Sequence, residues 1–389
     1  MTTKKAVFLL VSVVAMLSLL AAGVFGQSLQ KDNVYRHLSV FTEVLSIVNN
    51  NYVEQVSSDE LLDGAFGGVT QAVDEFSFYI PPADVAEYKK WTGSGAVTNI
   101  GLTLTKRFGY AFVIAVRDGS PAAKAGIGPG DFIEKIEGVP TAKMAVWQVL
   151  SKLQAPATAG RKVTVVHGGM TKREEMTIDF SQLAPAEFPS KEIDGTPYIK
   201  LTEFNFTTAK ALQAFLADAK SKAKGIVLID VRESSSDDIE SAARCADLLL
   251  AKGTITSVVG RKVEPKSWTA DKATSYDGDV LVLTDPSTAG AGEVFSSAIS
   301  GNGRGRVVGL PTYGRAIVQK TIDLPSGGAV CVTIGHYTTP DLKPIKDAGV
   351  KPDVAADRTL PEPDKTEKSD PVLEKALSLV GAKPAKAAA

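Results

Sequence analysis

The 389 residues are enough for between two and three domains, because a typical domain holds about 150 residues. With 44% hydrophobic and 22% charged residues, the composition is that of a globular protein and excludes a mostly disordered polymer. Lys and Arg number 43 and Asp and Glu 44, so the net charge of -1 argues against nucleic acid as a partner. Cys245 and Cys331 have no metal-ligand spacing with any histidine, so we expect no metal centre and no cofactor.

The N-terminus has the pattern of a segment that enters a membrane. Lys4 and Lys5 precede the uncharged residues 6–26, which at about 1.5 Å per residue are long enough to cross a hydrocarbon core. The two lysines orient such a segment so that the following chain lies on the far side. We therefore expect residues 1–27 to be a membrane anchor or a cleaved signal peptide, with a buried core helix as the less favoured interpretation. The rest of the chain is expected outside the cytoplasm, in the periplasm or cell envelope.

Residues 28–94 have mainly helical periodicity. Leu38, Phe41 and Leu45 recur at intervals of three and four residues, and Ser58 with Glu60 has the pattern of a second helix start. We therefore predict a helical N-terminal segment here.

Residues 95–182 combine short β-type runs with two helices. In the string SPAAKAGIGPGDFIEKIEG, Ser120 is a helix cap, Pro121 suits the first turn and Gly126 ends the helix. A second helix is expected from about Lys143. This β-rich module resembles a PDZ domain.

The PDZ resemblance implies a binding site for chain ends. Such domains add a peptide as an extra strand beside a helix, while backbone N–H groups of a loop hold the terminal carboxylate. Asn99, Ile100, Gly101 and Leu102 occupy the place of that loop. The alternative is that these four residues are simply the start of a strand.

Residues 183–357 alternate between helical and strand patterns, which predicts an open α/β sheet with covering helices. Two loops, Arg232–Asp238 and Asp285–Gly292, are expected beyond the carboxyl ends of strands, where the ligands of such sheets gather. The predicted elements are helix 207–222, strand 225–231, a helix from Ile239 that ends before Gly253, and the strands 254–259 and 280–284.

Residues 358–389 are predicted to form a proline-rich linker, a short helix from Pro371 and a tail. The fold class is therefore a multidomain one, α/β and α+β, made of the helical N-terminal segment, the β-rich PDZ module and the open α/β sheet.

The whole layout resembles the C-terminal processing, or tail-specific, serine peptidases. The resemblance rests on the strings VDEFSFYIPP, GIVLIDVR, DPSTAGAGEVF and VVGLPTYGRAIVQ. It implies an α/β peptidase-like domain in which a serine of a strand-to-helix turn attacks the peptide carbonyl. In the family a lysine 25 residues later takes the proton of that serine, and a glutamine four residues beyond orients the lysine.

The two working positions carry other residues in this chain. Tyr313 and Gly314 place the lysine position at Arg315, the orienting position at Gln319 and the nucleophile position at Gly290. Glycine has no nucleophilic side chain, and arginine, with a pKa of about 12.5 or more, does not act as a base.

The loop that follows the strand departs from the family as well. The resemblance implies an Asn-Pro-Gly-Gly run whose backbone N–H helps to hold the oxyanion, whereas this chain has Glu-Ser-Ser-Ser-Asp-Asp at residues 233–238. Asp237 and Asp238 would oppose a forming oxyanion.

Other nucleophiles are present in the same domain. Ser287 and Thr288 belong to the same turn, Ser296 and Ser297 follow in the helix, and His336 would be the base. Turn and helix hydroxyls are usually structural, and Cys331 is interpreted as a small buried apolar residue.

The sequence thus predicts an extracytoplasmic pseudo-peptidase that binds peptide or protein C-termini without cleaving them. Further expected partners are the membrane, through the N-terminal segment, and a family homologue or a second copy of the chain. One alternative is an active serine-type endopeptidase with a relocated nucleophile. Another is a structural envelope protein whose PDZ groove is closed.

Overall fold

The computed structural model describes residues 13, 16, 36–93, 100–155, 160–168, 172–271, 274–357 and 370–380. The chain divides into two compact units, residues 1–69 and 70–389. Apart from residues 13 and 16, the segment 1–27 that the sequence predicts to be an anchor or signal lies outside the described residues. Within the described part, no helix is long and apolar enough to span a membrane.

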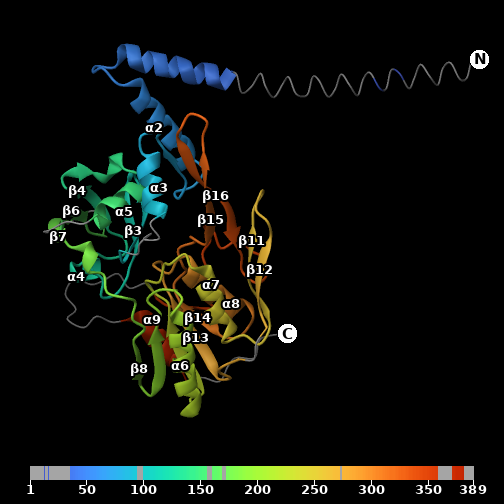
Figure 1. The fold of residues 1–389 in the computed structure, drawn as a ribbon. Coiled ribbons are helices and arrows are strands. Elements are labelled where there is room, and N and C mark those ends of the chain that lie inside the picture. The colour runs from blue at the N-terminus through green and yellow to red at the C-terminus, as the bar shows by residue number, and fades with distance from the viewer. Residues whose placement is uncertain are drawn as a thin grey trace, which may run out of the picture. The chain divides into compact units, whose positions relative to one another are not determined.

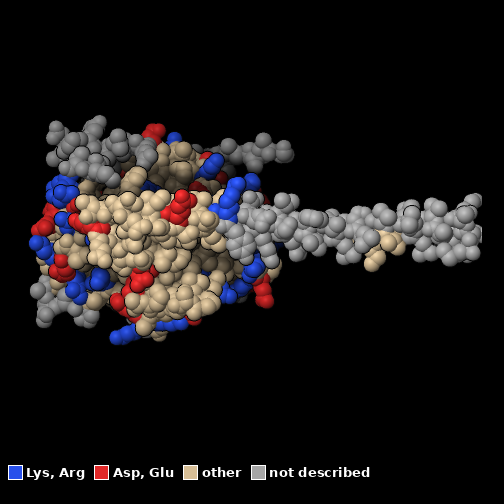
Figure 2. All heavy atoms as spheres, turned by 90° about the horizontal axis from the view of Figure 1, so that it is seen from above, with Lys and Arg blue, Asp and Glu red and all other residues tan. Residues whose placement is uncertain are grey.

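The first unit is helical, as predicted. Residues 36–51 form one helix, and α2 (Ser58–Gln71) begins the second and reaches just past the unit boundary. Both helices leave apolar side chains exposed. One face of the molecule, with its charged side chains coloured by sign, is shown in Figure 2. The large exposed apolar residues of the unit are Leu38, Val40, Val44, Ile47, Tyr52, Val53, Phe66 and Val69, besides Val13 and Met16.

The PDZ module is an antiparallel sheet with a helix on it (Figure 1). Its core contains Val113, Ile133, Val149 and Val163. The helix α5 (Val146–Gln154) begins three residues later than predicted, because residues 141–143 form a 3-10 turn first. As predicted, Ser120 caps α4 (Pro121–Lys124). The sheet order is β2 (Leu102–Arg107), β3 (Tyr110–Val116), β4 (Phe132–Ile136), β6 (Arg161–Val166), β7 (Arg173–Ile178), and β5 (Val139–Pro140) pairs with β4.

The second sheet of this unit is the predicted α/β sheet. Alternate residues of its strands face opposite layers: Val227 and Ile229 pack under α6, α7 and α8, while Leu228 packs toward α9. Burial on both faces explains the continuous apolar run. Neighbouring strands are parallel, except that β8 and β9 are antiparallel. The strand order is β17 (Val354–Ala355), β14 (Arg306–Gly309), β13 (Asp279–Thr284), β10 (Ile226–Asp230), β9 (Thr196–Lys200), β8 (Ser190–Ile193). The helices are α6 (Thr208–Ser221), α7 (Ile239–Asp247), α8 (Ala291–Gly301) and α9 (Pro371–Ser378).

A third, antiparallel sheet corrects two predictions. The strand predicted at 254–259 belongs here rather than to the parallel sheet, and it begins at Gly253, the residue predicted to end the preceding helix. Residues 78–80, within the segment predicted to be helical, form a strand after α2, and α3 (Val85–Gly93) follows them. The strands are β1 (Phe78–Ile80), β11 (Gly253–Val259), β12 (Lys266–Ala270), β15 (Ile317–Asp323) and β16 (Ala329–Tyr337).

A buried ion cluster fixes α9 to the end of β10. The Arg232 guanidinium contacts Asp230, whose side chain has no exposed surface, at 2.6 Å and Asp370, the N-cap of α9, at 2.7 Å. Removing one partner from such a cluster leaves an uncompensated buried charge.

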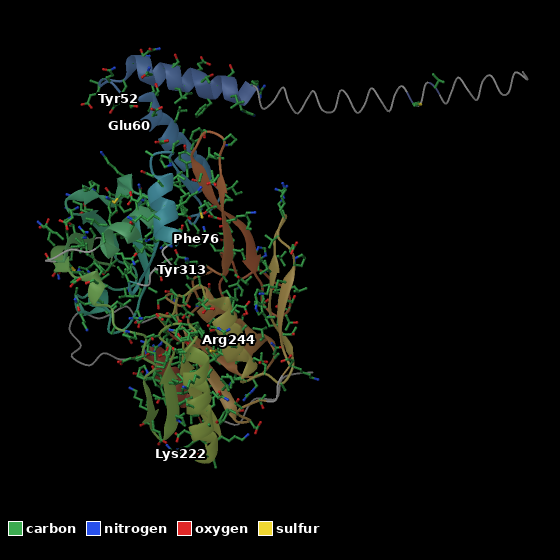
Figure 3. The ribbon with its side chains drawn as sticks, in the orientation of Figure 1. Tyr52, Glu60, Phe76, Lys222, Arg244 and Tyr313 are labelled. Carbon is green, nitrogen blue, oxygen red and sulfur yellow. The ribbon has the colours of Figure 1, made fainter. Side chains whose placement is uncertain are left out.

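We expect Arg232→Met to lower the free energy of unfolding by about 3–5 kcal/mol, because Asp230 loses its cation. Denaturation by urea measures this. The matched control is Lys222→Met, which removes an exposed i,i+4 pair with Asp218 at the end of α6 (Figure 3) and should leave the stability nearly unchanged. Equal losses in the two variants would contradict the assignment.

Candidate functional site

The two loops predicted to lie beyond the strand ends are in direct contact. The backbone N–H of Ala289 donates to the Ser234 carbonyl at 3.0 Å, and the N–H of Ala291 donates to the Ser236 carbonyl at 2.8 Å. Gly290 lies between them at φ 59° and ψ -114° and is the N-cap of α8. The loop after β10 therefore covers the turn that the resemblance assigns to the nucleophile.

The site leaves no room for a side chain at position 290. A Cβ on Gly290 would be 2.6 Å from the Ser236 carbonyl oxygen and 3.2 Å from Asp237 Oδ1. Ser236 is itself held, since its hydroxyl donates to the Phe204 carbonyl at 2.8 Å. In strand-turn-helix hydrolases the N–H after the nucleophile forms part of the oxyanion hole. Here the corresponding donor, the N–H of Ala291, is already bonded.

Arg315 forms a two-pronged ion pair with Asp237. The two guanidinium nitrogens donate to the two carboxylate oxygens at 2.9 Å each, and the Arg315 side chain is only 16% exposed. Its guanidinium also lies over the Phe76 ring at 5.9 Å. Asp237, which the sequence suggested would oppose an oxyanion, thus neutralises a cation. Asp238 is the N-cap of α7 and accepts from the Ser241 N–H at 2.9 Å.

Glu293 holds the two altered positions in register. One carboxylate oxygen accepts from the N–H groups of Gly290 at 2.9 Å and Arg315 at 2.8 Å, and the other from Gly314 N–H and the Thr312 hydroxyl. The side chain is fully buried, and this burial raises its pKa to about 7, although the hydrogen bonds pull in the other direction.

Gln319, the position that the resemblance assigns to the orienting residue, lines the same cavity as Arg315. Its side-chain nitrogen donates to the Phe76 carbonyl at 2.8 Å. Phe76 and Tyr313, both labelled in Figure 3, meet edge to face with ring centroids 6.4 Å apart. Gln319 therefore helps to attach the segment before β1 to β15.

The other candidate nucleophiles are buried and engaged. The Ser287 hydroxyl donates to Asp285 at 2.5 Å and that of Thr288 to the Val231 carbonyl at 3.1 Å. The hydroxyls of Ser296 and Ser297 donate to carbonyls of their own helix. Within the described part of the chain, no hydrogen bond joins any of these hydroxyls to His336, and Cys331 is a buried free thiol.

The PDZ strand edge and the loop after β10 face one cavity of about 560 Å³. On the PDZ side it is lined by β2 and α5, and on the other side by the loop after β10 and by Arg315 and Gln319. β2 is an edge strand, so its outer side is where an added strand would pair. Of the predicted carboxylate loop, Gly101 and Leu102 line the cavity, Ile100 is buried, and Asn99 lies outside the described residues.

Gly101 is required at its position. Its φ is +75°, and a Cβ there would be 2.4 Å from the Ser120 Cβ. The loop before β2 thus packs directly on the cap of α4. Among the described residues, no cluster of three or more His, Cys, Asp or Glu side chains is placed to hold a metal ion.

Comparison with known proteins identifies both parts. Residues 195–356 match the model of peptidase family S41, and residues 112–166 match a PDZ domain. The chain is thus an S41 peptidase-like protein with a PDZ domain. It belongs to the family of C-terminal processing serine peptidases.

Similar proteins are known from bacteria and chloroplasts. The chain is 27% identical to the carboxy-terminal-processing protease of Bartonella bacilliformis, over 92% of this chain and 84% of that one. It is 30% identical to the chloroplastic C-terminal processing peptidase of Tetradesmus obliquus over 73% of this chain, and spans 65% of that protein. It spans 59% of the carboxyl-terminal-processing peptidase 2 of Arabidopsis thaliana.

A solved structure shares the fold. The photosystem II D1 C-terminal processing protease superposes with a TM-score of 0.64 at 23% identity, and the match covers 88% of this chain and 97% of that one. At this identity the likeness establishes the arrangement of the sheets and helices, as the resemblance predicted.

Sequence reasoning missed the Asp237–Arg315 pair and the contact of Ser236 with Ala291. A signal for the first existed, because opposite charges stand at two of the places where the chain departs from the family, Arg315 and the loop 233–238. The second left no signal, since a backbone carbonyl has no sequence signature.

We expect Glu293→Gln to lower the free energy of unfolding by about 1–3 kcal/mol, because the amide nitrogen faces N–H donors instead of accepting from them. The raised pKa adds a pH dependence. The pKa of Glu293 is higher in the folded state than its unfolded value of about 4.3, so the unfolded chain loses its proton at a lower pH. The stability that Glu293 contributes is therefore lost as the pH rises toward about 7. The difference between wild type and Glu293→Gln should therefore shrink between pH 5 and pH 8, by at most about 1.4 kcal/mol per pH unit. A difference independent of pH, measured by denaturation across this range, would contradict it.

Proposed function

We propose that this chain is a non-catalytic member of its family that binds the C-terminal ends of polypeptides outside the cytoplasm. The location rests on the N-terminal pattern of two lysines followed by an apolar stretch. The binding role rests on the edge of β2 beside α5, which opens on a cavity of about 560 Å³.

One observation carries the non-catalytic part. The Ser236 carbonyl accepts the hydrogen bond of the Ala291 N–H, and it also stands 2.6 Å from where the Cβ of a residue at 290 would be. A nucleophile and an oxyanion both need that space. The ion pair between Arg315 and Asp237 supports the same conclusion, since a paired guanidinium does not accept a proton.

The alternative is a peptidase with a relocated nucleophile. The best candidate for such a nucleophile is Ser287. Its hydroxyl donates to the carboxylate of Asp285, and burial raises the pKa of that carboxylate. However, Ser287 is 1% exposed and also accepts from the Glu233 N–H at 2.8 Å. These bonds are typical of a turn, and they favour the non-catalytic proposal.

We expect the double variant G290S/R315K to remain unable to cleave an unstructured protein. The added Cβ meets the Ser236 carbonyl and should lower the stability by about 1–3 kcal/mol, and the oxyanion donor stays occupied. Cleavage should appear only when residues 233–238 are also replaced by the Gly-rich run of the family. Mass spectrometry of cleavage products measures this, and G290S/R315K is the control for the loop replacement.

Cleavage by the wild-type chain that is abolished by Ser287→Ala would overturn the proposal. A covalent acyl adduct on any hydroxyl of the wild type would have the same consequence.

We expect peptides with a free C-terminus to bind in the groove and their amidated forms to bind about ten- to a hundredfold more weakly, because the carboxylate loses its bonds to backbone N–H groups. Calorimetry measures both affinities. Gly101→Ala should weaken binding, since its Cβ forces the loop away from Ser120. The matched control is Gly128→Ala in the same module, where a Cβ meets no atom within 4 Å. Binding that does not depend on the free carboxylate would count against the groove.

A further inference from the structure

The charges around the cavity are unevenly distributed. Its lining holds two arginines, each of which is already paired: Arg117 with Glu203 at 3.0 Å and Arg315 with Asp237 at 2.9 Å. Acidic side chains are more numerous. The lining carboxylates are Glu75, Glu203, Glu233, Asp237 and Asp238.

Most of these acids have a positive partner. Besides the two paired with arginine, Glu233 contacts Lys200 at 2.7 Å, and Asp238 lies at the N-terminus of α7, where the helix dipole favours a negative charge. Glu75 differs. Its carboxylate accepts from the Tyr313 hydroxyl at 2.9 Å, and within the described residues it forms no direct ion pair with Lys or Arg, since Arg107 reaches only the same Tyr313 hydroxyl, at 3.4 Å.

Part of the cavity lining is aromatic. Phe76, Phe78, Tyr88 and Trp91 line the same cavity. A carboxylate together with aromatic rings is a combination that attracts a cation. The cavity already contains one example, because the Arg315 guanidinium lies between the Asp237 carboxylate and the Phe76 ring.

Glu75 has a defined place along the groove. The Thr105 hydroxyl, near the end of β2, donates to the Glu75 carbonyl at 3.2 Å. A peptide whose carboxylate lies at the loop before Leu102 must run antiparallel to β2, so that its upstream residues extend toward Thr105. In such a pairing the residue about three or four positions before the last comes next to Glu75.

We propose that the groove selects polypeptide tails that carry a Lys or Arg about three or four residues before an apolar C-terminal residue, and that Glu75 with the aromatic wall reads this cation. The inference rests on the proposed binding function and adds the class of ligand to it. The apolar end is expected because Leu102, Leu104, Val146 and Leu150 line the groove. An acidic residue at the upstream position would be repelled by Glu75.

Calorimetry on the full chain with short synthetic peptides tests the inference. The peptides share a C-terminal leucine and differ only at the position three before it, which is Lys, norleucine or Glu. Norleucine keeps most of the apolar stem of lysine and removes the charge. We expect the Lys peptide to bind about three- to tenfold more tightly than the norleucine peptide, and the Glu peptide to bind most weakly. Added salt should reduce the advantage of Lys by screening.

Glu75→Gln should bring the affinity for the Lys peptide to that for the norleucine peptide and leave the latter unchanged. The matched control is Glu174→Gln, which changes the net charge equally but lies on β7, at the opposite edge of the PDZ sheet. It should preserve the preference for Lys. The peptide series on the wild type decides the question even if Glu75→Gln alters the fold.

The outcomes separate this inference from the proposed function. If the norleucine peptide binds in a carboxylate-dependent way and Lys brings no gain, the inference is wrong and the binding function remains. A preference for Glu at this position would overturn it equally. If no peptide binds, both are wrong.

Discussion

The ion pair between Arg315 and Asp237 is the interaction on which the site depends. Arginine stays charged at any physiological pH, and a guanidinium that is 16% exposed requires a partner. Asp237 supplies that partner and draws the preceding residue, Ser236, over the turn at Gly290. The carbonyl of Ser236 then satisfies the Ala291 N–H, so the end of α8 has no free donor at this point. At the position that the family resemblance assigns to a neutralisable lysine, a permanent cation thus makes a structural contact.

The same loop connects the PDZ module to the sheet. Ser235 shares a hydrogen bond with Thr103 on the edge strand β2, and Lys200 contacts both Glu233 of the loop and Asp118 of the module. Because these contacts lie beside the lining of the cavity, a tail that pairs with β2 comes next to the loop that covers Gly290. The proposed binding groove and the covered turn therefore share one set of neighbouring residues.

The sequence predicted what depends on local patterns. The positions 290 and 315 follow from counting along motifs, and buried runs such as residues 226–230 identify strands because both of their faces are covered. The sequence did not predict elements or contacts whose pairing residues lie far away along the chain. Residues 78–80 become a strand only because β16 pairs with them, and Gly253 starts a strand that pairs outside the parallel sheet. Asp237 and Arg315 are 78 residues apart, and only the fold brings them together.

Binding and catalysis make different demands on the same scaffold, which explains how one can persist without the other. Catalysis requires groups that stabilise charge as it develops, such as a free N–H at the end of α8 and a base that loses its proton. Binding of a chain end requires only an open strand edge, a fixed loop and a cavity. The strand edge and the loop rest on the core of the PDZ module and on Gly101 packed against Ser120, whereas Arg315 contributes only to the opposite wall of the cavity. Under the proposed function, the groove does not require the nucleophile, and the carboxylate of Glu75 beside it is the proposed determinant of which tails are held.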